Sequence, residues 1–189
     1  MMDAQTRDDP YQHCPEFDTA RFHLRQVREE DAGDLLCFYG DAADWMFFAN
    51  AVGDQHIFTN AHPPAAEVAK LIRFWLEEYR NRVYLRLSVI DKATGKAVGT
   101  IELCHTYLHL DLSAPYETRE AIAELLTLAD REFFALQGVP CLQIKALPDA
   151  TERLAALAAA GYRPSDREAA EERYFMKKCS GADHRMPCL

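Results

Sequence analysis

The sequence lacks several features that would indicate particular classes of protein. No apolar run approaches the roughly 20 residues that a membrane-spanning helix needs, and the first residues do not form a signal peptide. Positive charge is scarce, with 21 Lys and Arg against 30 Asp and Glu and a net charge of -9. A protein that binds nucleic acid or an anionic membrane needs clustered positive charge on its surface. We therefore expect a cytoplasmic protein whose partners include neither nucleic acid nor membrane.

Cysteines spaced as metal ligands are also missing, because none of the six cysteines is part of a C-x-x-C motif. Structural zinc sites normally show such ligand spacing, so we expect no bound metal. The chain has 189 residues, of which 49% are hydrophobic, which is enough for one domain with a sizeable core. We place this domain at residues 17–179, with flexible tails at 1–16 and 180–189. The sequence does not determine an oligomeric state.

Hydrophobic periodicity predicts six strands and four helices in the order β-α-α-β-β-β-α-β-α-β. Asp149, with Glu152 three residues later, predicts a capping box at the start of the last helix. A three-strand meander followed by a helix that crosses to another strand implies a mixed α/β sheet with helices on both faces. The predicted strands lie near 21–27, 84–89, 99–103, 108–112, 141–147 and 174–178, and the helices near 29–39, 68–79, 118–137 and 149–160.

A group of polar residues lies on the third and fourth predicted strands. If residues 106–107 form a two-residue turn, Glu102 lies opposite Asp111 and Cys104 lies opposite His109. Two opposed carboxylates repel, and this can raise one pKa into the range of a general base. Three alternatives stay open: a solvent-facing strand surface, a metal site through Cys104, His109 and a carboxylate, or a nucleophile pair formed by Cys104 and His109.

Several short phrases of the sequence, in this order, resemble the GNAT superfamily of acyl-CoA-dependent N-acetyltransferases, and most of all the branch that acetylates ribosomal-protein N-termini. They are Phe17–Arg25 with Glu29–Ala32, Val98–Leu103 and Ala159–Tyr162. The resemblance covers residues 17–178. It implies a GNAT-like single domain that uses acetyl-CoA as cosubstrate. A primary amine of a small molecule or peptide would attack the thioester directly.

The resemblance also implies roles for individual residues. A carboxylate or water near the fourth strand takes the proton from the amine, which makes Glu102, His109 and Asp111 the catalytic candidates. Backbone N–H groups near Leu112 and Ser113 would polarise the acetyl carbonyl, in the gap between the fourth and fifth strands. The acceptor pocket would be lined by Trp45, Phe47, Phe48, His56 and Tyr107.

The window that should bind the CoA pyrophosphate departs from the family motif, Arg/Gln-x-x-Gly-x-Gly/Ala. Residues 117–122 contain no glycine, and Glu117 and Glu120 add negative charge. We still expect unpaired N–H groups at the start of the following helix to face the anion. The cofactor-binding candidates here are Thr118, Arg119, Glu120, Ala121 and Ile122.

The last predicted helix, near 149–160, departs from the family as well. It has Ala150, Arg153 and Leu157 in place of the usual Asn, Ser and Tyr. We therefore expect CoA binding at least tenfold weaker than in a glycine-bearing relative. The alternative function is a non-catalytic GNAT-fold domain that binds another ligand or a protein partner.

Overall fold

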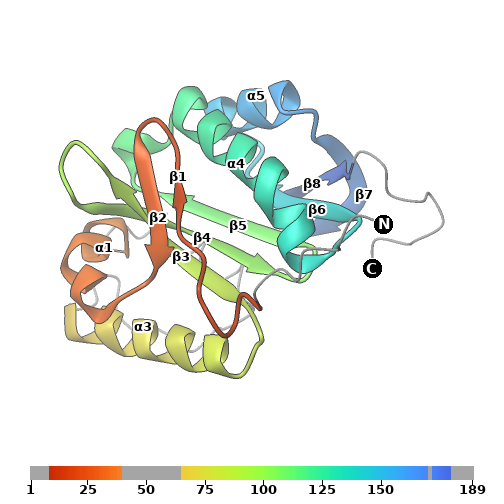
Figure 1. The fold of residues 1–189 in the computed structure, drawn as a ribbon. Coiled ribbons are helices and arrows are strands. Elements are labelled where there is room, and N and C mark those ends of the chain that lie inside the picture. Colours follow the sequence, from red (N-terminus) through yellow and green to blue (C-terminus); the bar gives the residue numbers. More distant parts are fainter. Residues whose placement is uncertain (1–8, 40–64, 170–171, 180–189) are drawn as a thin grey trace.

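The computed structural model describes residues 9–39, 65–169 and 172–179, which form one sheet flanked by helices (Figure 1). The strands are β1 (Phe17–Asp18), β2 (Phe22–Gln26), β3 (Leu85–Asp91), β4 (Ala97–Cys104), β5 (Tyr107–Leu112), β6 (Cys141–Ala146), β7 (Arg163–Ala169) and β8 (Glu172–Lys178). The helices are α1 (Ala32–Tyr39), α3 (Ala65–Arg80), α4 (Arg119–Gln137) and α5 (Thr151–Ala159).

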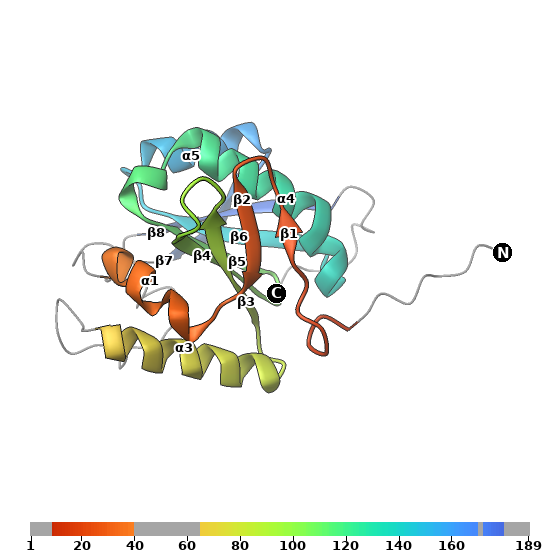
Figure 2. The same cartoon turned by 60° about the vertical axis from the view of Figure 1, so that its left-hand side comes forward.

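The described strands form one sheet in the order β1-β2-β3-β4-β5-β6-β8-β7. All neighbours are antiparallel except β5 and β6, which run parallel. Figure 2 shows α1 and α3 on one face of this sheet and α4 and α5 on the other. The predicted mixed α/β sheet with helices on both faces is therefore confirmed.

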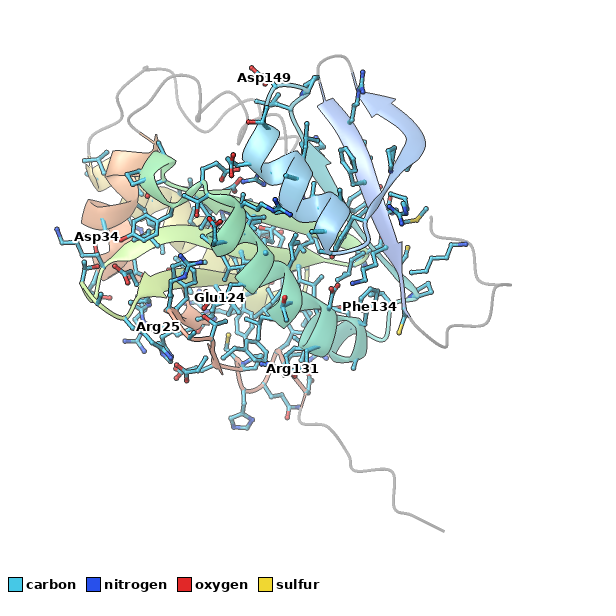
Figure 3. The ribbon with its side chains drawn as sticks, turned by 90° about the horizontal axis from the view of Figure 1, so that it is seen from above. Arg25, Asp34, Glu124, Arg131, Phe134 and Asp149 are labelled. Carbon is cyan, nitrogen blue, oxygen red and sulfur yellow. The ribbon has the colours of Figure 1, made fainter. Side chains whose placement is uncertain are left out.

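The larger core lies between the sheet and the α4–α5 face, which Figure 3 views from outside. Helix α4 begins after Thr118, whose hydroxyl accepts a hydrogen bond from the Ala121 N–H, and it ends at Gly138 in the left-handed conformation. The capping box predicted for α5 is wrong, because its N-cap is Ala150 and no side chain caps it. Glu152 instead accepts a hydrogen bond from the Arg119 N–H at the start of α4, at 3.3 Å.

Residues 9–16, which we expected to belong to a flexible tail, make specific contacts with the domain. The Tyr79 hydroxyl of α3 donates a hydrogen bond to the Pro10 carbonyl at 2.7 Å. Arg82, just after α3, forms an ion pair with Asp9 at 2.8 Å. This part of the N-terminal segment is therefore held against the end of α3.

The register of the β4–β5 hairpin differs from the predicted one. Cys104 pairs with Tyr107, so the turn consists of residues 105–106, and Glu102 lies opposite His109 rather than Asp111. His105, the first residue of the observed turn, adopts a left-handed φ of 50°. The two registers differ by two residues and keep the same side chains on each face, so hydrophobic alternation could not distinguish them.

Gly99 in β4 is required by the close approach of β5. A Cβ atom at this position would lie 2.1 Å from the Asp111 carbonyl oxygen. We expect Gly99→Ala to lower the free energy of unfolding by about 1–3 kcal/mol, because β5 must move away. Urea unfolding measures this change. Gly33→Ala is the matched control, since a Cβ on α1 meets nothing within 4 Å, and equal stability of the two variants would contradict the prediction.

Candidate functional site

The strands β5 and β6 separate soon after they meet. They pair at Tyr107 and Gln143, where the Gln143 N–H donates to the Thr106 carbonyl at 2.7 Å. Beyond this point a small pocket opens between the strands. It is lined by Leu108, His109, Leu110, Asp111, Ile144, Lys145 and Arg153. The divergence therefore creates the gap that the family resemblance implies at this place.

Arg153 of α5 fills one side of this gap. Its Nη1 donates to the Leu110 carbonyl at 2.7 Å, while Nε and Nη2 bind the Glu117 carboxylate at 2.5 and 2.7 Å. The Arg153 side chain is only 6% exposed. Sequence reasoning noted Arg153 only as a departure from the family. The available signal was its spacing, because Arg153, Ala156 and Leu157 follow the i, i+3, i+4 stripe of a buried helix face.

Asp111 of β5 is a buried carboxylate at the wall of the same gap. It is 3% exposed, and its Oδ2 atom has no hydrogen-bond partner among the described residues. Burial raises the pKa of Asp111 to about 6, although Arg86 and Arg153 counteract this effect. A carboxyl group with such a pKa can accept a proton near neutral pH, which is the chemistry of a general base.

Glu102 and His109 lie beside Asp111 on the same face of the sheet. Arg86 of β3 holds the Glu102 carboxylate through two contacts of 2.8 and 2.5 Å, and its guanidinium stacks 4.1 Å from the Trp75 ring centre. The His109 Nε2 atom lies 3.9 Å from Glu102 Oε1. The three predicted catalytic residues are therefore brought together. Because Glu102 is already ion-paired, Asp111 is the better candidate for the base.

Two of the alternatives left open for this face, the solvent-facing surface and the nucleophile pair, lose their support. Glu102 and Asp111 are both buried, so the face is not a solvent-exposed strand surface. Cys104 lies opposite Tyr107 rather than His109. Burial raises the pKa of the Cys104 thiol, whereas a nucleophilic cysteine needs a lowered pKa. In the described part of the chain, no three His, Cys, Asp or Glu side chains are arranged to hold a metal ion.

The residues predicted to contact the acetyl carbonyl and the acceptor lie in different environments. The Ser113 N–H donates to the Val98 carbonyl at 2.9 Å, so it does not face the gap. Leu112 is buried in the larger core. The Tyr107 ring stacks on His109 and meets Tyr174 edge-on. The remaining acceptor-pocket candidates, Trp45, Phe47, Phe48 and His56, lie outside the described residues.

The N–H groups at the start of α4 are largely engaged by the protein itself. Arg119 N–H donates to Glu152, Ala121 N–H to the Thr118 hydroxyl, and Ile122 N–H to the Thr118 carbonyl. The expectation of unpaired N–H groups is therefore wrong at these positions. Ala121 and Ile122 also bury their side chains in the core, while Glu120 is exposed. These residues do not fit a CoA pyrophosphate in the manner that the resemblance implies.

No protein-family model and no curated protein matches this chain. Among the described residues, no helix combines the length and apolar character needed to cross a membrane.

Solved structures, in contrast, match almost the whole domain. The ribosomal-protein-S5-alanine acetyltransferase from Vibrio fischeri has a TM-score of 0.61 and 14% identity, over 88% of this chain and 98% of that one. A GNAT-family acetyltransferase from Bacillus anthracis has a TM-score of 0.63 and 11% identity, over 87% and 98%. The ribosomal L7/L12 α-N-protein acetyltransferase in complex with coenzyme A has a TM-score of 0.59 and 9% identity, over 87% and 98%. The fold of this chain is therefore that of the GNAT acetyltransferases.

Proposed function

We propose that this chain is an acyltransferase that moves an acetyl group to a primary amine, with Asp111 as the general base. The observation that carries the proposal is Asp111 itself, a buried carboxylate with one oxygen unpartnered among the described residues, at the gap between β5 and β6. A buried polar atom without a partner costs stability unless a ligand completes its interactions. A small-molecule or peptide ammonium group supplies the hydrogen bond to Oδ2 and a positive charge next to the carboxylate.

The reaction uses Asp111 in one proton transfer. The ammonium gives a proton to Asp111 Oδ2, and the neutral amine then attacks the acyl carbonyl of a thioester donor. The carbon–nitrogen bond forms, the carbon–sulfur bond breaks, and the amine loses its second proton as the thiolate leaves and is protonated. The ion pair between Arg86 and Glu102 fixes the floor of the site beside Asp111.

Asp111→Asn is expected to lower the rate of amine acetylation at least 100-fold, because an amide cannot accept the proton. In the unmodified protein the rate should fall as the pH drops below about 6, where Asp111 becomes protonated. The measurement is thiol release from acetyl-CoA, with a polyamine or a peptide with a free N-terminus as acceptor, between pH 5 and 9.

Asp130→Asn is the matched control for this experiment. Burial raises the pKa of the Asp130 carboxyl as well, but Asp130 binds Lys177 and does not line the gap. Its rate and pH profile should match those of the unmodified protein. Equal rates for Asp111→Asn and the unmodified protein would remove Asp111 from the mechanism.

The second candidate function is a non-catalytic domain that binds a ligand or protein partner through the same gap. It is favoured by Arg153, which lines the gap and is ion-paired with Glu117, and by the engaged N–H groups of α4. A ligand that binds the native state raises its apparent stability. A rise in the melting temperature with CoA or a candidate amine, without any product in the acetylation assay, would favour this second function.

A further inference from the structure

A lysine lines the gap from the strand that faces the proposed base. Lys145 of β6 and Asp111 of β5 both belong to the lining, and the Lys145 side chain is half-buried. The two strands run parallel and pair at Tyr107 and Gln143. Lys145 follows this pairing by two residues along β6, and Asp111 follows it by four along β5. The gap therefore has a carboxylate on one wall and an ammonium group on the other.

Both charged side chains lie on the same face of the sheet. The residues that alternate with them pack into the larger core, namely Leu108, Leu110 and Leu112 on β5 and Leu142, Ile144 and Ala146 on β6. Because successive side chains point to opposite faces of a strand, Asp111 and Lys145 share the face away from this core. The Lys145 Nζ atom lies 5.3 Å from the centre of the Tyr174 ring on β8, the strand beside β6. This cation–π contact holds the ammonium group beside the gap.

The proposed reaction moves negative charge across this gap. The acceptor ammonium gives its first proton to Asp111, and the neutral amine then forms the carbon–nitrogen bond. The carbon–sulfur bond breaks and leaves its electron pair on the sulfur atom, which takes the second proton of the nitrogen afterwards. A thiolate that forms out of bulk water is costly unless a positive group or a hydrogen-bond donor faces it. The base occupies one wall, so the developing charge needs a cation on the other.

We propose that the Lys145 ammonium group stabilises the departing thiolate of the acyl donor through a charge-assisted hydrogen bond. An ammonium group carries three N–H donors, so Lys145 can bind the sulfur atom while it keeps other contacts. Arg153 also lines the gap, but its Nε, Nη1 and Nη2 atoms bind Glu117 and the Leu110 carbonyl. The inference rests on the proposed acyltransferase function and adds a catalytic residue to it.

The basicity of the leaving group tests this role. S-acetyl-N-acetylcysteamine releases a basic alkyl thiolate, whereas S-para-nitrophenyl thioacetate releases a weakly basic aryl thiolate that needs little stabilisation. Lys145→Met should lower the rate of amine acetylation by the alkyl thioester roughly 100-fold and change the rate with the aryl thioester little. Lys145→Arg keeps the charge and should lose less. Both rates are measured with a polyamine acceptor, after subtraction of the reaction without protein.

Binding of the product thiol gives a second readout, which does not depend on turnover. Desulfo-CoA lacks the sulfur atom, so its affinity is the reference for the affinity of CoA. Above a pH of about 8.5, where a free thiol ionises, CoA should bind the unmodified protein roughly tenfold more tightly than desulfo-CoA. Calorimetry measures both affinities. Lys145→Met should remove the advantage of CoA.

Lys178→Met is the matched control, because it removes one positive charge from β8, and Lys178 is not among the residues that line the gap. It should change neither the rates with the two thioesters nor the advantage of CoA. The role of Lys145 is overturned if Lys145→Met slows both thioesters equally. It is also overturned if CoA has no advantage over desulfo-CoA, or if the advantage survives in Lys145→Met. Circular dichroism confirms that each variant is folded.

The outcome for Lys145 is separate from the outcome for the reaction. Asp111-dependent acetylation by the unmodified protein, with equal losses for the two thioesters in Lys145→Met, preserves the acyltransferase function and rejects the role of Lys145. If the unmodified protein uses neither thioester, but CoA has an advantage over desulfo-CoA that Lys145→Met removes, then the proposed function fails and the contact between Lys145 and the sulfur atom stands.

Discussion

Arg86→Met is expected to lower the free energy of unfolding by about 3–5 kcal/mol. The substitution removes the partner of Glu102, whose carboxylate is 3% exposed and would remain as an uncompensated buried charge. It also removes the hydrogen bond from Arg86 to the Thr100 hydroxyl and the stacking on Trp75. Urea unfolding at pH 7 measures the loss through the shift of the midpoint.

Two further variants separate the buried charge from the loss of packing. Arg86→Met combined with Glu102→Leu should recover most of the loss, because an apolar pair of similar volume replaces the ion pair. Arg73→Met removes an exposed pair with Glu29 and should cost less than about 1 kcal/mol. If the single Arg86 variant is as stable as Arg73→Met, then the Arg86–Glu102 pair does not support the floor of the site.

Periodicity predicted the elements that bury one clear face. Helices α3 and α4 have continuous apolar stripes, and both were placed within three residues of their observed ends. The two strands that were missed lack such a pattern. The first, β1, is only two residues long. The second, β7, is Arg163–Ala169, which begins with Arg163 and Pro164 and does not alternate.

The candidate site was predicted only in part, because its residues meet through long-range packing. Alternation placed Glu102, His109 and Asp111 on one face, but the exact pairs depend on where the turn falls. No local pattern links Glu117 with Arg153, which lie 36 residues apart and meet only when α5 packs beside α4. The sequence also could not show that Glu152 accepts a hydrogen bond from the first residue of α4, Arg119, rather than capping its own helix.

Asp111→Asn is expected to stabilise the folded protein increasingly as the pH rises. Folding raises the pKa of Asp111 from 3.8 to about 6, so the folded state disfavours the ionised carboxylate. This cost is absent below pH 3.8, grows between pH 3.8 and about 6, and is complete above that range. An amide does not ionise, so the stability difference between the variant and the unmodified protein should rise by up to about 3 kcal/mol across this window.

Asp31→Asn is expected to change the stability of the folded protein in the opposite direction in the same experiment. Burial raises the pKa of Asp31, but hydrogen bonds from Arg25, Ser88 and the Arg28 N–H outweigh it and hold the pKa below its usual value. Its ionised form is therefore stabilised by folding, and Asp31→Asn should destabilise the protein above about pH 4. Urea unfolding from pH 4 to 8 compares the two variants. If the stability difference between Asp111→Asn and the unmodified protein does not change with pH, then folding does not destabilise the ionised form of Asp111, and the prediction is wrong. In the opposite case, a variant that is more stable and also inactive identifies Asp111 as a group kept for its chemistry at the expense of the fold.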